Sequence, residues 1–209
     1  MILDSSSSLA TLELSRENYA APCPAFAIGP LQVVPLSRFY MKHQPTIDAT
    51  RGLSSRNGAM RTDVKLRDVE PSDLPVFYEH QLDVEATAMA AFPSRDRAAF
   101  DAHWATNVLG NPAAITQTIL VDGQVAGWIG SWPQDGARHV GYWIGKEHWG
   151  KGVATKTLAA FLHLVIERPI HAHVVEHNVA SIRVLEKCGF SVERVERGEV
   201  VVEMVFVLR

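Results

Sequence analysis

A hairpin signal near the middle of the chain is the feature that most constrains the fold. The dipeptide Asp122-Gly123 separates the runs ITQTILV and QVAGWIGSW, both rich in residues that favour strands. Asp-Gly readily adopts the positive φ angles of a two-residue hairpin turn. The two runs are therefore predicted to pair as antiparallel strands, so the fold must contain an antiparallel sheet.

Further strands and helices are predicted on both sides of this hairpin. Turn residues, capping residues and apolar periodicity mark their ends. In chain order they are a strand over 64–69, a helix after Pro71-Ser72-Asp73, a helix from about 95 to 110, the hairpin, a turn over 133–136, a strand over 139–144, a helix bearing Leu158 to Val165 and ended by Pro169, a strand over 170–175, a helix over 178–187, and two final strands. Two helices thus precede the hairpin. The order predicts a mixed α+β class with one sheet.

Composition limits the classes of function. The chain has 209 residues, a formal net charge of -3 and two cysteines far apart in sequence. This balance disfavours sequence-independent binding to nucleic acid, and the cysteines indicate neither a disulfide framework nor a zinc site. No apolar run is long enough to span a membrane, and the start lacks the pattern of a secretory signal. We expect a soluble protein of the reducing cytoplasm.

Residues 1–61 differ from the rest of the chain. They contain a serine run and several prolines, and they show no sustained periodicity. We expect an N-terminal extension that is either flexible or docked on the domain or a partner, or that lies upstream of the true start. The folded domain is predicted to cover 62–209.

A glycine-containing loop is the most informative local motif. The run WGKG, at 149–152, follows a predicted strand and precedes a predicted helix. Unpaired amides and the positive end of the helix dipole can bind an anion such as a pyrophosphate, and glycines allow the backbone to approach it closely. An ordinary junction between a loop and a helix is the simpler interpretation. The pattern matches neither a Walker A loop nor the G-x-G-x-x-G fingerprint.

A second motif and its spacing give the loop a family context. The run from Tyr142 to Thr155, followed by Asn178-Val-Ala-Ser181 and by Gly189-Phe190, resembles the GNAT superfamily of N-acetyltransferases over about 62–209. The branch that it most resembles includes ribosomal-protein N-terminal alanine acetyltransferases. The resemblance implies a GNAT fold of three layers, in which a central, mostly antiparallel sheet has helices on both faces and splayed central strands.

The resemblance also implies where acetyl-CoA binds as the acyl donor. Strand backbone would hold the pantetheine arm and loop amides the pyrophosphate. The family usually has Gln or Arg where this chain has Trp149, but backbone amides do the binding. Asn178 would hydrogen-bond near the pantetheine, although a helix N-cap is an equally simple role for it. The implied donor-binding residues are Trp143, Ile144, Trp149, Gly150, Lys151, Gly152, Val153, Ala154, Thr155 and Asn178.

The implied chemistry is direct attack of an amine on the thioester in a ternary complex. The backbone N–H of Ile144 would stabilise the oxyanion. His139 stands where relatives often carry a Glu base, and imidazole titrates near neutrality; a surface histidine is the alternative. The tyrosine that relatives use as an acid is replaced by Leu185, so Ser181 or water would assist the leaving thiolate. Cys188 is expected to be a buried structural thiol.

Three functions remain open on this basis. The first is an N-acetyltransferase acting on a protein N-terminus or a small-molecule amine, without a metal. The second is the same fold with a longer donor such as succinyl-CoA, and the third is a non-catalytic acyl-CoA-binding module. The expected partners are an acyl-CoA and an amine acceptor, with no membrane or nucleic acid, and a homodimer is left open.

Overall fold

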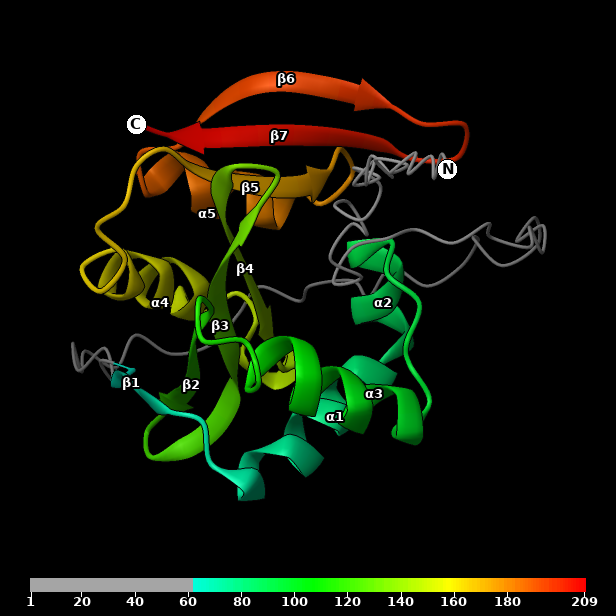
Figure 1. Ribbon diagram of the computed structural model, residues 1–209, viewed down its shortest axis with the longest axis vertical. Coiled ribbons are helices and arrows are strands. Elements are labelled where there is room, and N and C mark those ends of the chain that lie inside the picture. Colours follow the sequence, from blue (N-terminus) through cyan, green and yellow to red (C-terminus); the bar gives the residue numbers. More distant parts are fainter. Residues whose placement is uncertain (1–61) are drawn as a thin grey trace, which may run out of the picture.

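Residues 62–209 are the part of the chain that the computed structural model describes, and the extension expected over 1–61 lies outside it. Within this part, seven strands form one sheet in the order β1-β2-β3-β4-β5-β7-β6 (Figure 1). All neighbours are antiparallel except β4 and β5, which are parallel. The strands are β1 (Val64–Asp68), β2 (Ile115–Val121), β3 (Gln124–Gln134), β4 (Ala137–Ile144), β5 (Ile170–Val175), β6 (Ser191–Arg197) and β7 (Val202–Leu208).

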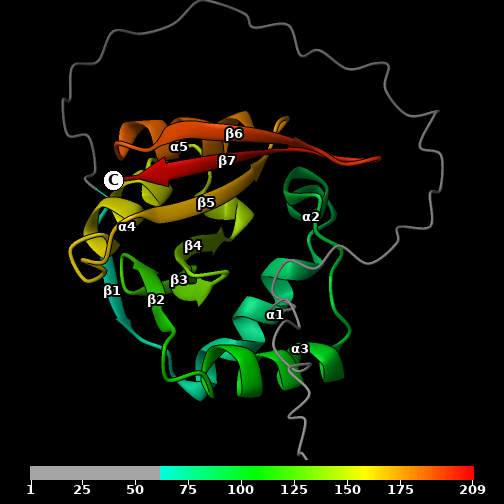
Figure 2. The ribbon, with the colours of Figure 1, turned by 45° about the horizontal axis from the view of Figure 1, so that its top comes forward.

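Helices cover both faces of the sheet, which confirms the predicted mixed α+β class (Figures 1 and 2). One face carries α4 (Val153–Phe161) and α5 (Val179–Lys187), and the other carries α1 (Leu74–Leu82), α2 (Val84–Ala90) and α3 (Arg97–His103). A π-helical segment, Trp104–Val108, continues α3. Short 3-10 turns at Pro71–Asp73 and Lys146–His148 precede α1 and follow β4. No helix in this part of the chain is both long and apolar enough to cross a membrane.

Each face of the sheet has its own hydrophobic core. On the α4 and α5 face, Leu158 and Phe161 are fully buried against the sheet. On the other face, Trp104 contacts the edge of Trp128 with ring centroids 5.6 Å apart and packs beside the buried Phe77. Burying a side chain of this size contributes roughly 2 kcal/mol, so the two cores hold the three layers together.

A buried carboxylate ties the first helical turn to the sheet. Asp73 accepts two hydrogen bonds of 2.7 Å from Arg67, one of 2.6 Å from the Thr118 hydroxyl and one of 2.9 Å from the Glu70 amide. Burial alone raises the pKa of Asp73, but the hydrogen bonds from Arg67 and Thr118 outweigh this and hold the pKa below its usual value. The carboxylate is therefore ionised and fully hydrogen-bonded in the folded protein.

Strands β4 and β5 separate soon after they meet. Their pairing is limited to Arg138 with Ile170 and His139 with His171, although β4 continues to Ile144 and β5 to Val175. The remaining halves of the two strands diverge and leave a V-shaped opening in the sheet, which confirms the predicted splay. We call the last pair, His139 with His171, the vertex.

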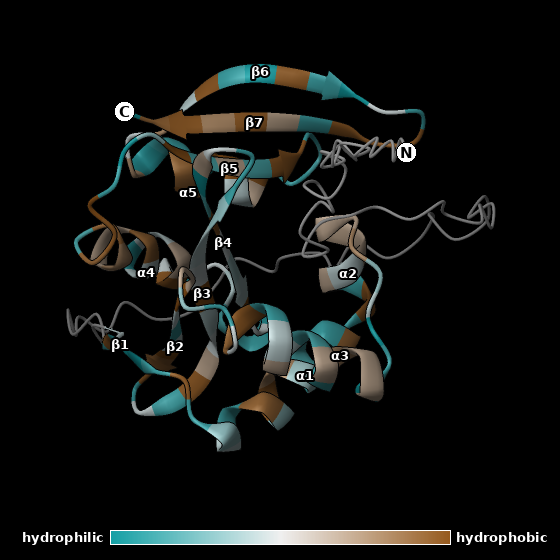
Figure 3. Ribbon diagram, viewed as in Figure 1, coloured by the Kyte–Doolittle hydropathy of each residue, from teal (hydrophilic) through white to brown (hydrophobic). Residues whose placement is uncertain are grey.

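The strand at the open edge of the sheet is polar. Figure 3 shows hydrophilic residues along most of β6, whereas β7 is largely hydrophobic. Every residue of β6 is exposed, and four of its seven residues are charged. Charged side chains on an edge strand disfavour pairing with a second sheet.

The structure differs from the predicted elements in several places. A helix absent from the prediction, α2, begins where Asp83 accepts hydrogen bonds from the first amides of the helix. Pro133 lies inside β3, so the turn is confined to Asp135-Gly136. Helix α4 ends at Phe161, well before Pro169, and irregular turns then carry Val165 into the core.

Candidate functional site

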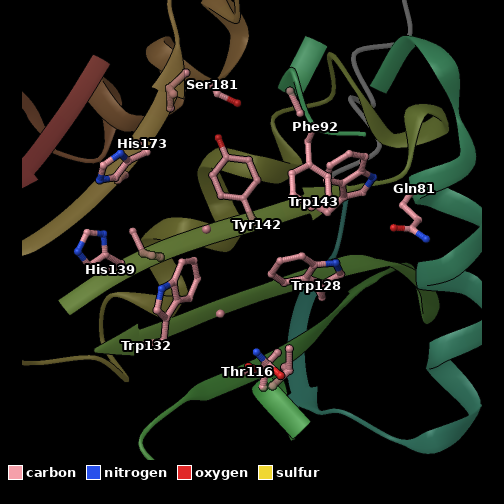
Figure 4. A pocket seen from close by; sticks show the side chains of 18 of the residues that line it. Gln81, Phe92, Thr116, Trp128, Trp132, His139, Tyr142, Trp143, His173 and Ser181 are labelled. Atoms are coloured by element: carbon pink, nitrogen blue, oxygen red, sulfur yellow. The ribbon is translucent and has the colours of Figure 1, made fainter. Parts of the chain in front are cut away.

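A cavity of about 210 Å³ lies at the opening between β4 and β5 (Figure 4). Trp132, His139 and Trp143 line it from the face that carries α1 to α3. Tyr142 and Ser181 line it from the face that carries α4 and α5. Side chains alternate across a strand, so lining from both faces means that the cavity passes through the sheet at the V.

The hydrogen-bond register shows which backbone groups of β4 face this opening. The Gly145 amide donates to the Ala126 carbonyl at 2.9 Å, and Ile144 lies opposite Gly127. This places Ile144 in a non-hydrogen-bonded pair, so its N–H and C=O point away from β3 and toward the V. The Ile144 carbonyl accepts a 2.8 Å hydrogen bond from the Trp149 indole. The Ile144 N–H has no hydrogen bond to the described part of the chain, as its predicted role as an oxyanion donor requires.

A close approach between β3 and β4 maintains this register. Gly127 has φ +148°, and a Cβ at this position would lie 2.0 Å from the carbonyl oxygen of Trp143. The adjacent Ala126 is an extra residue in the pairing with β2, which makes a β-bulge. Only glycine fits there, and it lets β3 pack against the part of β4 that lines the V.

The loop before α4 is the segment for which a phosphate site is predicted. Gly150 and Gly152 have φ angles of +70° and +73°, and a Cβ on either would meet no atom within 4 Å. The amides of residues 150–155 make no hydrogen bond to the described part of the chain, and Lys151 is exposed beside them. Free amides at the N-terminus of a helix can hold an anion. The residues present therefore fit a pyrophosphate.

Asn178 and Ser181 lie at the start of α5, on the other side of the opening. Asn178 is the N-cap, and its Oδ1 accepts a 3.1 Å hydrogen bond from the Ser181 amide. The N-cap role is thus present, and the side-chain amide nitrogen of Asn178 makes no hydrogen bond to the described residues. Ser181 lines the cavity beside it.

Tyr142 is a polar residue in the cavity that sequence reasoning missed. Its hydroxyl points toward Ser181 (Figure 4), yet it is buried and has no partner in good hydrogen-bond geometry among the described residues. Burial raises the pKa of Tyr142 to about 12, with a smaller opposing effect from Ser181. A buried donor without a partner costs free energy, so this hydroxyl is suited to a ligand atom. The sequence signal that could have identified Tyr142 is its position at the start of the family-like run from Tyr142 to Thr155.

His139 lies at the vertex, in the cavity, as its predicted role requires. It is 9% exposed, and its ring stacks near Trp132 with centroids 6.4 Å apart. Burial, together with the neighbouring His173 and His171, lowers the pKa of His139 to about 4. The imidazole is therefore neutral at pH 7 and a weak proton acceptor.

Aromatic residues form the wall of the cavity on the α1 to α3 face. The Trp143 indole donates a 3.1 Å hydrogen bond to the His80 carbonyl. The Trp143 and Phe92 rings pack edge to face, with their centroids 6.3 Å apart. Phe92 and Trp104 also line the cavity. Four polar or flexible residues of α1 and α2 are not part of the lining: Glu79, His80, Glu85 and Met89.

Cys188, which was expected to be a buried structural thiol, is half-buried. Its thiol lies 3.6 Å from the Thr155 carbonyl, between α5 and α4. Burial raises the pKa of this thiol, which disfavours the thiolate that a nucleophile needs.

Comparisons with known proteins agree with this fold. A family model described as an acetyltransferase (GNAT) domain matches residues 63–191, well over half of the chain. The probable N-acetyltransferase YjcK of Bacillus subtilis (strain 168) is 41% identical over 66 residues, a stretch that is 29% of this chain and 36% of that protein. The match thus spans about a third of this relative's length.

Solved structures resemble the fold at low sequence identity. An aminoglycoside acetyltransferase AAC(6')-Ib in complex with coenzyme A has a TM-score of 0.60 and 20% identity, covering 70% of this chain and 94% of its own. A spermidine N-acetyltransferase from Vibrio cholerae, with CoA and spermine, has a TM-score of 0.61 and 16% identity, with coverages of 69% and 94%. At these identities the likeness shows the fold alone.

Proposed function

Because this chain belongs to the GNAT acetyltransferase family, we propose that it transfers an acetyl group from acetyl-CoA to a primary amine while both substrates are bound. The cavity that passes through the sheet carries this proposal. A donor bound on the α4 and α5 face can present its thioester through the V to an amine on the other face. Holding both reactants at one opening supplies the proximity that the reaction needs.

Donor binding would use the backbone more than side chains. The free amides of 150–155 would hold the pyrophosphate, and the edge of β4 would hold the pantetheine arm. Trp149 would keep the loop against the end of β4, and the Asn178 amide would donate toward the pantetheine. These assignments extend the predicted donor site.

Catalysis requires an oxyanion donor and a partner for the departing thiolate. The amine nitrogen forms a bond to the acetyl carbon, and the carbonyl oxygen gains charge that the Ile144 N–H can stabilise. When the carbon–sulfur bond breaks, the Tyr142 hydroxyl and Ser181 can donate to the sulfur. Because a thiol has a pKa near ~8.5, this departure needs only modest assistance.

The lining of the cavity favours an acceptor with an apolar or aromatic body. Aromatic faces bind apolar groups and also attract a single cationic amine. The aromatic residues of the lining on this side are Phe77, Phe92, Phe100, Trp104, Trp128, Trp132 and Trp143.

Charges in the lining argue against a polycationic acceptor. Histidines aside, the charged side chains among the described lining residues are Arg95 and Glu203. Burial lowers the pKa of His103 and of His139 to about 4, so both are neutral. One cation and one anion leave no surplus of negative charge. Two proteins of similar fold are named for polycationic acceptors, one an aminoglycoside acetyltransferase and the other a spermidine N-acetyltransferase. We nevertheless expect this chain to prefer a monoamine.

A thiol-release assay tests the proposal. Purified protein with acetyl-CoA would be offered phenylethylamine, tryptamine, alanyl and seryl peptides, spermidine and kanamycin. We expect acceptor-dependent release of CoA, with kcat/KM at least ~10-fold higher for the aromatic monoamines than for the polycations. Tight donor binding without release for any acceptor would instead support a binding module. Faster release from succinyl-CoA would support the longer donor.

A matched pair of glycine variants tests the donor site. Gly152→Trp should abolish CoA binding by filling the loop. Gly123→Trp is its control, because both glycines have positive φ and open surroundings, but Gly123 lies in the β2–β3 turn. Calorimetric titration should show loss of affinity in the first variant alone. Equal CoA affinity in both variants would contradict the assignment of the loop.

A further inference from the structure

Three histidines gather where β4 and β5 part. His139 belongs to β4, and His171 and His173 belong to β5. The ring of His139 lies 5.6 Å from that of His171 and 5.3 Å from that of His173, measured between centroids. His171 forms the vertex pair, and His173 is the next residue of β5 on the same face. His173 thus stands beside the opening through which an acetyl group would pass.

Both β5 histidines pair with a carboxylate, but only one pair lines the cavity. His173 Nδ1 lies 3.1 Å from Glu203 of β7, and both residues line the cavity. His171 Nε2 lies 3.1 Å from Glu193 of β6, and neither residue is part of the lining. A carboxylate can only accept, so the His173 tautomer carries its proton on Nδ1 and leaves the lone pair on Nε2.

His139 lacks such a partner. It forms no ion pair with a carboxylate in the described part of the chain, and it is crowded by the two β5 histidines. Burial and the two β5 histidines disfavour a proton on His139 more than Asp135 and the Gln134 backbone favour it, so its pKa is about 4. His173, in contrast, has the Glu203 carboxylate 3.1 Å from its Nδ1.

We infer that His173, positioned by Glu203, accepts the proton of the attacking amine. This inference rests on the proposed acetyl transfer and adds a catalytic residue and a positioning residue from β5 and β7. His139 remains the competing candidate from the sequence, lining the same opening.

The step balances without a further reactant. As the amine nitrogen bonds to the acetyl carbon, its proton moves to Nε2 of His173, while the Nδ1–H continues to donate to Glu203. Breaking the carbon–sulfur bond leaves a thiolate. The proton on His173 then passes through water to the thiolate, which yields the amide, free CoA and the neutral imidazole.

Other charged groups surround the pair. Glu196 of β6 lies close to the pair. One carboxylate oxygen of Glu196, one of Glu203 and one ring nitrogen of His173 all lie within 4.8 Å of one another. Arg194 holds Glu196 at 2.7 Å, which offsets its charge. His139 is a further titratable neighbour, with its ring centroid 5.3 Å from that of His173. Because the three groups could also share a cation, the experiment includes a chelator.

Kinetics of glutamine variants test the inference, on whichever acceptor the wild type uses best. His173→Gln should lower kcat by ~100-fold or more with little change in donor affinity, as expected for loss of a general base. Glu203→Gln should lower kcat by ~10-fold, because it retains a hydrogen-bond acceptor but loses the charge. It should also move the acidic limb of the kcat/KM profile to lower pH, which a merely structural role would not do.

His171→Gln is the matched control, since it removes a histidine with the same kind of partner from outside the cavity. We expect it to change kcat less than ~2-fold. A large loss in His139→Gln with none in His173→Gln would overturn the inference and return the base to β4. Loss of wild-type activity in EDTA would also overturn it, by assigning the pair to a metal.

Nuclear magnetic resonance of the ring nitrogens gives a readout that needs no turnover. We expect ¹⁵N-histidine spectra of the wild type to show the proton of His173 on Nδ1, and an Nε2-protonated ring would contradict the inference. Failure of the proposed function would look different, because neither the wild type nor any variant would then release CoA from acetyl-CoA with any acceptor. Turnover that is indifferent to His173→Gln would refute the base alone.

Discussion

The indole nitrogen of Trp149 donates a 2.8 Å hydrogen bond to the carbonyl oxygen of Ile144. This bond joins the phosphate-type loop to the end of the strand that lines the V. It also occupies the Ile144 carbonyl, so the N–H is the group of that residue that remains open to a ligand. A tryptophan at a position where the family usually has Gln or Arg thus has a specific structural task.

Removing this bond should weaken donor binding. Trp149→Phe keeps an aromatic ring but loses the indole N–H. The lost hydrogen bond should weaken the binding free energy of CoA by about 1 kcal/mol, which is a roughly fivefold higher Kd. Calorimetric titration of the purified variant would measure it. Trp132→Phe is the control, because it alters the acceptor side and should leave the Kd for CoA unchanged. An unaltered Kd in Trp149→Phe would mean that the loop holds its place without the bond.

Gly127→Ala should be severely destabilising. The new Cβ would lie 2.0 Å from the Trp143 carbonyl oxygen, so β3 and β4 would have to move apart. We expect a loss of ~3 kcal/mol or more in the free energy of unfolding. Gly123→Ala should cost only ~1 kcal/mol, because its φ is also positive but nothing lies near. Similar urea midpoints for the two variants would refute the close approach.

Asp73 should make the stability depend on pH. The pKa of its carboxyl is below the usual value in the folded protein, so the unfolded chain binds a proton more readily in acid. The contribution of Asp73 to the free energy of unfolding is therefore complete above the pKa of the unfolded chain, about 3.9, and is lost as the pH falls through the lower pKa of the folded protein. Asp73→Asn should cost ~3 kcal/mol at pH 7, because it removes the buried negative charge that accepts two hydrogen bonds from Arg67.

Urea unfolding of both proteins from pH 7 to about pH 3 would test this. The difference between wild type and Asp73→Asn should narrow toward the acid end. A difference that stays constant with pH would show that Asp73 is not ionised in the folded state.

Tyr142→Phe should separate stability from function. The hydroxyl is buried and has no partner in good hydrogen-bond geometry among residues 62–209, so its removal should leave the free energy of unfolding unchanged or raise it by about 1 kcal/mol. If the hydroxyl donates to the departing sulfur, kcat should fall ~10-fold or more. Thermal unfolding and thiol release on the same preparation would show both effects. A less stable variant with normal kcat would assign Tyr142 to the core.

Features set by neighbouring residues were predictable from the sequence. Asp122 and Gly123 have φ angles of 50° and 83°, the two positive values that a tight hairpin turn requires. The turns of the glycine loop before α4 depend on Gly150 and Gly152 themselves, whose φ angles are +70° and +73°. Helix α2 was missed because VEATAMA is short and rich in alanine, so no apolar stripe distinguishes it, and its start depends on the Asp83 cap.

Relationships across the sheet could not be predicted in the same way. His173 and Glu203 are 30 residues apart and meet because β5 pairs with β7. Tyr142 appeared to be an ordinary strand residue until the parting of β4 and β5 placed its hydroxyl beside Ser181. The two histidines of IHAHVV were a visible signal, since alternate positions on a strand share a face. Nothing local indicated which carboxylate each one would meet.

The parting of β4 from β5 leaves the sheet incomplete by one neighbour over the second half of β4. A donor bound there would act as a substitute strand, supplying the hydrogen bonds that β5 does not. Any ligand that binds only the folded state shifts the unfolding equilibrium toward it. The lifetime of this protein in a cell would then follow the supply of acyl-CoA, with more of the chain unfolded and open to proteolysis when that supply runs low.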